Sequence, residues 1–141
     1  MPKLDETFFT TVGCMDGRAQ AVVAEYGLKK FGAKFADTIT EAGFVGQLAN
    51  NPQESLLDSI KNKLDISLGK HRSKGIVVHG HQECAGNPVG EEKHKGDIRK
   101  TVQVVQSLIN SSVPVVGVFV KRSQKDPKTW ETEEISSKVL A

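Results

Sequence analysis

Short apolar runs alternate along the chain with segments whose apolar residues recur every three or four positions. Four of the runs are expected to be buried strands: Thr7–Cys14, Ala36–Ala42, Gly75–His81 and Val113–Lys121. The last two are rich in β-branched residues and lack strict alternation, which is typical of parallel strands covered on both faces. The pattern therefore predicts a mainly parallel sheet of four to five strands.

Helical periodicity fills the gaps between these runs. The first helix is expected to be short and to end before Gly27, and a last one to run from Pro127 to the C-terminus. For the second helix, Asn51 is a suitable N-cap and Pro52 suits the first helical position. The apolar faces of the first three helices are Ala19, Val22, Val23 and Tyr26; Leu56, Leu57, Ile60, Leu64 and Leu68; and Ile98, Val102, Val105, Leu108 and Ile109.

The alternation of strands and helices predicts a three-layer α/β fold with right-handed crossovers, and the absence of a linker or repeat predicts one domain over residues 1–141. In such sheets, ligands bind beyond the carboxyl ends of the strands, near a switch in strand order. Cys14 ends the first predicted strand, His81 ends the third, and Cys84 follows in the next loop. These three residues are therefore expected to meet at one edge of the sheet.

Charge and cysteine content narrow the classes of function. The net charge is only +2, and acidic and basic residues are mixed along the chain, which argues against nucleic acid as a partner. No segment is apolar for long enough to span a membrane, and the N-terminus lacks the apolar core of a signal peptide. We therefore expect a cytoplasmic protein, in which two cysteines serve metal binding or catalysis rather than cross-linking.

His81 and Cys84 form an H-x-x-C pair that can aim both side chains at one ion. Adding Cys14 gives two thiolates and one imidazole, which is a ligand set that Zn²⁺ prefers. Three protein ligands without an obvious fourth fit a catalytic zinc site, which keeps one position open, better than a closed structural site. His79 lies two residues before His81, so it faces the same side of the strand and stays an alternative ligand or a proton relay.

Other interpretations of these residues stay open at this stage. The two cysteines could be ordinary buried side chains or a redox disulfide pair, although they form no C-x-x-C motif. Asp16 and Arg18 could be a plain surface ion pair. A cysteine-dependent phosphatase is disfavoured, because Arg18 follows Cys14 too closely for the C-x5-R phosphate loop of those enzymes. His71 and His94 lie among charged residues and are expected to be solvated.

The two motifs together resemble those of a known family. C-x-D-x-R after a first strand (Cys14, Asp16 and Arg18) and G-H-x-x-C after a third (Gly80, His81 and Cys84) are similar to the signature of the β-class carbonic anhydrases. The resemblance covers residues 7 to 121. It implies that Cys14, His81 and Cys84 bind zinc. It also implies an enzyme, a lyase of the carbonate dehydratase type, in which zinc-bound hydroxide hydrates carbon dioxide reversibly to bicarbonate.

The same resemblance implies the roles of the remaining site residues. Asp16 would accept a hydrogen bond from the zinc-bound water or hydroxide, and Arg18 would pair with Asp16 and hold it off the metal. In some family members the aspartate instead becomes the fourth zinc ligand. The family also forms homodimers or higher homo-oligomers, which would give a short chain more apolar surface to bury.

The sequence departs from the family pattern in three places. The family's amino-terminal helices, which wrap a partner subunit, have no counterpart before the first strand. The segment Thr40–Gly43 reads TEAG where RNAG is usual, so Glu41 would bring a carboxylate near the pocket, and CAGN replaces CGG or CGA after Cys84. Two alternatives therefore stay open: hydrolysis of a related small substrate, carbonyl sulfide or carbon disulfide, and a catalytically silent zinc-binding or interaction protein.

Overall fold

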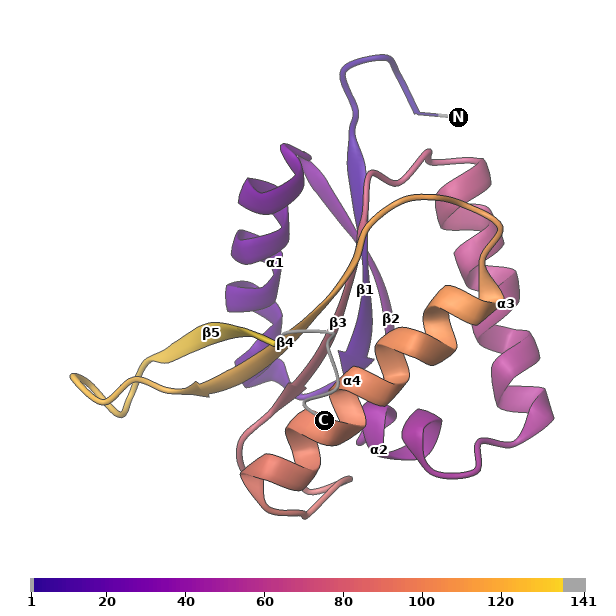
Figure 1. Cartoon of the computed structure of the whole chain (residues 1–141). Coiled ribbons are helices and arrows are strands. Elements are labelled where there is room, and N and C mark those ends of the chain that lie inside the picture. The colour runs from indigo at the N-terminus through magenta and orange to yellow at the C-terminus, as the bar shows by residue number, and fades with distance from the viewer. Residues whose placement is uncertain (1, 136–141) are drawn as a thin grey trace.

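The computed structural model describes residues 2–135, which form a five-stranded sheet flanked by helices (Figure 1). The order of the strands across the sheet is β2-β1-β3-β4-β5. The first four are parallel and β5 is antiparallel to β4. The strands are β1 (Phe8–Cys14), β2 (Phe35–Glu41), β3 (Ile76–His81), β4 (Val115–Arg122) and β5 (Trp130–Ile135).

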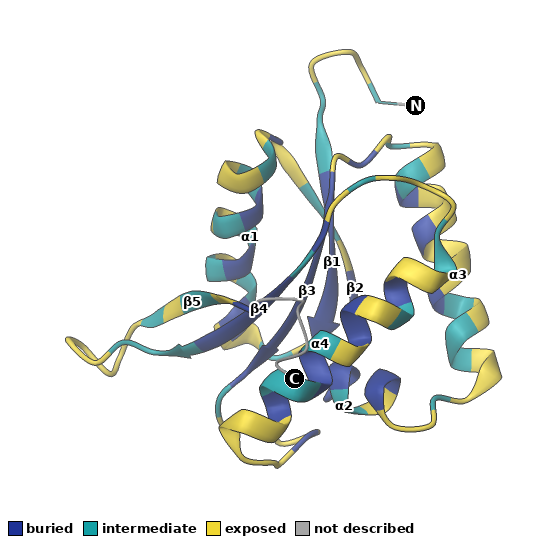
Figure 2. Cartoon of the chain, viewed as in Figure 1, coloured by how far each residue is buried: buried dark blue, intermediate teal, exposed yellow. Residues whose placement is uncertain are grey.

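Helices cover both faces of the sheet and complete three layers. Helix α1 packs on one face, and α2, α3 and α4 pack on the other (Figure 1). The central strands carry side chains that are buried on both faces, as the run of buried residues along β1 and β3 shows in Figure 2. The predicted α/β fold is confirmed. The helices are α1 (Gly17–Phe31), α2 (Phe44–Ala49), α3 (Glu54–Gly69) and α4 (Glu91–Leu108).

Helix α1 is longer than predicted because Gly27 is a packing residue rather than a stop signal. A Cβ atom at Gly27 would collide with the ring of Phe9, so glycine allows helix and strand to approach closely. The helix ends instead at Gly32, whose left-handed backbone (φ 61°) caps it.

The start of α3 also differs from the prediction. Asn51 does not cap the helix but has a left-handed backbone (φ 51°), and Gln53 is the N-cap. The short helix α2, between β2 and α3, was not predicted from the sequence. Its apolar face buries Phe44, Val45 and Leu48 against the main core, which accounts for so short a helix being retained.

The predicted C-terminal helix from Pro127 is wrong for the part of it that the structure describes. Residues 130–135 form β5, and residues 136–141 lie outside the described residues. Pairing with β4 decides this outcome, because β5 hydrogen-bonds along the otherwise open edge of β4. Ion pairs across the strands add to it, for example Lys121 Nζ at 3.0 Å from the Glu133 carboxylate. Within residues 2–135, no helix has both the length and the apolar character needed to cross a bilayer.

Candidate metal centre

Cys14, His81 and Cys84 meet at the carboxyl ends of two adjacent parallel strands. Cys14 is the last residue of β1, His81 is the last residue of β3, and Cys84 lies in the loop after β3. From β1 the chain leads to β2 on one side of the sheet, whereas from β3 it leads to β4 on the other. The three side chains thus occupy a switch point in strand order, which is where open α/β sheets bind ligands.

The distances within this cluster match a tetrahedral metal site. The Sγ atoms of Cys14 and Cys84 lie 3.7 Å apart, and the ligand atoms of all three residues lie within 4.8 Å of one another. Two thiolates on a tetrahedral zinc at about 2.3 Å would be separated by about 3.8 Å. A disulfide requires about 2 Å, and both cysteines are free thiols. All three residues are buried.

The imidazole of His81 is oriented as a metal ligand would be. Its Nδ1 lies 2.7 Å from the backbone carbonyl oxygen of Gln82, which fixes the ring and its tautomer. Its Nε2 is fully buried and has no hydrogen-bond partner among the described residues. A buried nitrogen without a partner is costly unless something binds it. The donor set of two sulfurs and one free nitrogen therefore fits zinc.

The backbone around the two sulfurs favours thiolates. The backbone N–H of Gly43 donates to Sγ of Cys14 at 3.5 Å. Burial raises the pKa of the Cys14 thiol, but the adjacent His81 imidazole and backbone N–H groups outweigh burial and lower the pKa to about 7. Burial and the neighbouring Cys14 raise the pKa of Cys84. One thiol is thus readily ionised near neutral pH, and a bound cation would deprotonate the other.

Asp16 and Arg18 lie directly beside this cluster. The Arg18 guanidinium grips both carboxylate oxygens of Asp16, at 3.0 Å and 2.8 Å, and the Arg18 backbone N–H donates to the same carboxylate, making Asp16 the N-cap of α1. Hydrogen bonding from Arg18 lowers the pKa of Asp16 to about 2. Oδ2 of Asp16 is 3.8 Å from Nε2 of His81. An ionised carboxylate is therefore held at the edge of the metal cluster.

Three residues near the site were not predicted as site residues from the sequence: Glu83, Arg122 and Trp130. Arg18 also donates to the backbone oxygen of Glu83 at 3.2 Å, and its guanidinium carbon lies 5.0 Å from the ring centroid of Trp130. Arg122 pairs with the Glu83 carboxylate at 2.7 Å and 3.0 Å and lies 4.5 Å from the same ring centroid. Of the three, only Glu83 had a signal in the sequence, because it lies between His81 and Cys84. Arg122 and Trp130 belong to β4 and β5, which are distant from both motifs in the sequence.

The other histidines do not join the cluster. His79 is fully buried beside Gly13, and burial lowers its pKa to about 4. The group of described residues that could hold a metal ion does not include it. The prediction that His94 is solvated is wrong, because it is only 3% exposed and packs edge-on against Phe119. His71 is half-buried rather than solvated, with Nδ1 2.7 Å from a carboxylate oxygen of Asp37.

Three glycines, Gly43, Gly46 and Gly86, allow two segments beside the centre to approach closely. Gly43 has a left-handed backbone (φ 60°), and a Cβ on it would collide with the backbone of Gly86. A Cβ on Gly46 would collide with the side chain of Asn87. The loop after Cys84 can therefore lie against the start of α2 only because these positions lack side chains.

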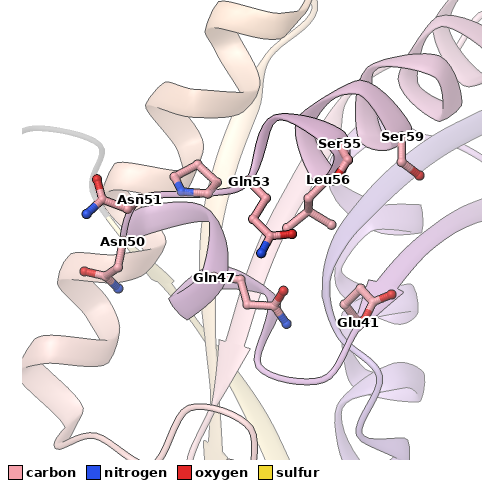
Figure 3. A pocket seen from close by; sticks show the side chains of 9 residues that line it. Glu41, Gln47, Asn50, Asn51, Gln53, Ser55, Leu56 and Ser59 are labelled. Atoms are coloured by element: carbon pink, nitrogen blue, oxygen red, sulfur yellow. The ribbon is translucent and has the colours of Figure 1, made fainter.

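Glu41 lies close to the centre in the sheet but faces a different cavity. It is the ladder partner of Cys14 and is exposed. Figure 3 shows its side chain at a polar pocket of about 490 Å³ between the end of β2, α2 and the start of α3. The other residues of that pocket are Gln47, Asn50, Asn51, Pro52, Gln53, Ser55, Leu56 and Ser59.

Comparison with known proteins agrees with this geometry. Residues 4–136 match a family model described as "Putative carbonic anhydrase". No curated protein matches the chain. Two solved structures share the fold. The β-carbonic anhydrase isoform I (TvaCA1) of Trichomonas vaginalis has a TM-score of 0.56 at 17% identity, with 96% of this chain and 87% of that chain covered. The β-carbonic anhydrase CafA of Aspergillus fumigatus has a TM-score of 0.63 at 12% identity, with 96% and 78% covered.

The family match spans almost the whole chain, and the five-stranded sheet with its flanking helices is the fold of the two solved β-carbonic anhydrases. The chain belongs to the carbonic anhydrase family, as a divergent member of the β class.

Proposed function

We propose that the protein catalyses the zinc-dependent, reversible hydration of carbon dioxide to bicarbonate, with Cys14, His81 and Cys84 as the zinc ligands. One observation carries the proposal: a buried imidazole nitrogen without a partner faces two sulfurs 3.7 Å apart. A zinc ion at such a site supplies a Lewis acid that makes hydroxide available near neutral pH.

Asp16 and Arg18 orient the reacting groups in this proposal. Asp16 is ionised at neutral pH, so its carboxylate can only accept hydrogen bonds. A carboxylate beside the open position would accept a hydrogen bond from a water or hydroxide there and so direct an oxygen lone pair toward carbon dioxide. Arg18 occupies both oxygens of Asp16, which favours an arrangement with Asp16 beside the metal rather than bound to it.

We also propose that the chain acts as a single zinc-binding domain, in the cytoplasm and as a homodimer or higher homo-oligomer. Two free thiols fit a reducing compartment. The β2 strand, at one end of the sheet, leaves Phe35 45% exposed, and a second copy could cover such an edge.

The first experiment measures zinc content and carbon dioxide hydration on one purified sample, at about pH 7 and about pH 9. One zinc per chain with hydration at both pH values supports the proposal, whereas activity only at the higher pH indicates that Asp16 closes the site in its resting state. Zinc without hydration activity would instead favour one of the two alternatives: hydrolysis of carbonyl sulfide or carbon disulfide, or a catalytically silent zinc-binding protein. A protein without zinc would refute the ligand assignment.

A second measurement separates the ligand set from general stability. Cys14→Ser removes one sulfur and changes little in volume. We expect this variant to lose most of its zinc and its hydration activity while its circular dichroism stays that of a folded α/β protein. Full zinc and full activity in Cys14→Ser would exclude Cys14 as a ligand.

A further inference from the structure

Trp130, the first residue of β5, lies against the arginine that holds Asp16. The guanidinium carbon of Arg18 is 5.0 Å from its ring centroid, within the range of a cation–π contact. β5 is antiparallel to β4, and Trp130 is the ladder partner of Arg122. A strand that is remote in the sequence from all the motif residues therefore reaches the candidate metal centre through one aromatic side chain.

Arg18 is partly open to solvent, which leaves room for a further support. Its side chain is 39% exposed, so water screens even its bidentate ion pair with Asp16. Its further contact is with Glu83: Nη2 donates to the backbone oxygen and Nη1 lies 3.5 Å from the carboxylate. The flat ring of Trp130 limits the directions in which the guanidinium can swing away from these acceptors.

Glu83, the second partner of Arg18, is itself held by Arg122. Arg122 pairs with both carboxylate oxygens of Glu83 and donates to the backbone oxygen of Pro127 at 2.9 Å. Glu83 itself has a left-handed backbone (φ 58°), which a non-glycine residue adopts only when its surroundings hold it. Asp16 and Glu83 balance the charges of the two arginines, so Trp130 adds packing to a neutral cluster.

We propose that Trp130 is a positioning residue: it holds the Arg18 guanidinium between the Asp16 carboxylate and the Glu83 backbone, and so fixes Asp16 beside the metal ligands. The inference rests on the proposed function for its effect on catalysis. Its structural part, the ordering of Arg18, stands without it. Trp130 itself touches neither the ligands nor the reacting atoms in this scheme; it acts through Arg18.

The test compares Trp130→Leu with Trp130→Phe in the zinc-loaded full chain. Leucine fills much of the space without a π face, whereas phenylalanine keeps one. We expect kcat for carbon dioxide hydration to fall about tenfold in Trp130→Leu, with KM and zinc content unchanged, and to recover to within about twofold of wild type in Trp130→Phe. Thr132→Ala, two residues along on the same face of β5, is the matched control and should leave kcat unchanged.

A readout besides activity is the Nε–H signal of Arg18 in a proton–nitrogen NMR spectrum. In the wild type this group donates to Asp16 and should show a high heteronuclear NOE and slow exchange with water. In Trp130→Leu the NOE should fall and the exchange accelerate, with partial restoration in Trp130→Phe. An unchanged Arg18 signal in a folded Trp130→Leu protein would overturn the inference, as would an unchanged kcat, or an activity loss that phenylalanine does not rescue.

The two proposals fail in different ways. If the wild type holds zinc but hydrates no carbon dioxide, the proposed function fails, and the NMR comparison alone decides whether Trp130 positions Arg18. If the wild type is active but Arg18 is equally ordered in both proteins, the inference about Trp130 fails while the function stands. If Trp130→Leu does not fold, Trp130→Met takes its place, since methionine also fills space without a π face; the same loss of Arg18 order and of kcat is expected, and Trp130→Phe is again the variant that should restore both.

Discussion

Nη2 of Arg18 donates a hydrogen bond to the backbone oxygen of Glu83, 3.2 Å away, although 65 positions separate the two residues in the chain. Arg18 follows the first strand, and Glu83 lies between His81 and Cys84. The hydrogen bond therefore ties the start of α1, just after Cys14, to the loop that carries Cys84. Since the same guanidinium grips Asp16, one side chain links the carboxylate to both halves of the candidate zinc site.

Replacing Arg18 by leucine should change how stability depends on pH. Hydrogen bonding from Arg18 depresses the pKa of Asp16 to about 2, so folding gains stability that is complete above the unfolded pKa of about 4 and is lost as the pH falls toward 2. We expect Arg18→Leu to lose about 1 kcal/mol of unfolding free energy at neutral pH, allowing for solvent screening, and less than that at pH 2. Urea titrations of the metal-free proteins from pH 2 to pH 6 measure this, and parallel curves for both proteins would contradict it.

Two neighbouring buried histidines offer a matched test of the ligand set. The ring centroids of His81 and His94 are 6.5 Å apart, and of these two only His81 belongs to the group of described residues that could hold a metal ion. We expect His81→Gln to lower the zinc affinity by about a hundredfold or more, because one of three ligands is lost, and His94→Gln to leave it within about threefold. A competition assay with a coloured chelator gives both values. Equal losses in both variants would point to general disruption instead.

Zinc binding should weaken as the pH falls. The ligands must be deprotonated, and the pKa of Cys14 is about 7 while that of Cys84 is raised. Each proton displaced by the metal costs about tenfold in apparent affinity per pH unit below the pKa of its group. We therefore expect the apparent affinity to drop by about tenfold or more between pH 7 and pH 6. Calorimetry in two buffers of different ionisation enthalpy counts the released protons; an affinity that does not change with pH would contradict thiolate ligation.

The glycine at the start of α2 should be far less replaceable than one in the middle of α4. Gly43→Ala puts a methyl group against the backbone of Gly86 at a left-handed position, and we expect a loss of about 2 kcal/mol or more of unfolding free energy. Gly96 is helical and a Cβ there meets nothing within 4 Å, so Gly96→Ala should stabilise the protein by about 0.5–1 kcal/mol. Chemical denaturation measures both, and the expectation fails if the two variants shift stability in the same direction.

Asp97 and Asp65 each lie four residues after a lysine on a helix, but they should contribute differently to the free energy of unfolding. Asp97 pairs with Lys93 and accepts from Asn87 in the loop after Cys84, and its side chain is 3% exposed. Asp65 pairs with Lys61 across an equal spacing, but its side chain is 55% exposed. Asp97→Ala should cost about 2 kcal/mol, because it leaves the buried Asn87 amide without its acceptor, and Asp65→Ala less than about 0.5 kcal/mol. Equal denaturation midpoints for the two variants would refute the distinction.

The ligand positions could be predicted because they depend on local patterns. Runs of β-branched residues mark β1, β3 and β4, and in a parallel sheet the carboxyl ends of the strands share an edge. Cys14 and His81 end their strands in the sequence, so a shared sheet edge followed from the fold class, whereas their close approach depends on β1 and β3 being neighbours. The proposed roles of Asp16 and Arg18 came from the resemblance to a family, and in the structure both lie beside the cluster of Cys14, His81 and Cys84.

The errors share a cause in contacts between residues far apart in the chain. The segment after Pro127 has no apolar pattern that marks it as a strand, and it becomes β5 because the edge of β4 is available for pairing. His94 appeared solvated among charged neighbours, yet α4 turns it toward Phe119. Gly27 appeared to end a helix, yet Phe9 uses its missing side chain.

The sequence by itself determined the fold class, the four parallel strands and the three residues that could bind zinc, because periodicity and motif spacing are properties of neighbouring residues. Tertiary structure alone decided the order of the strands, the free Nε2 of His81 and the stacking of Arg18 on Trp130. These features depend on packing and hydrogen bonding between distant segments, whose energies are set only when the sheet is assembled.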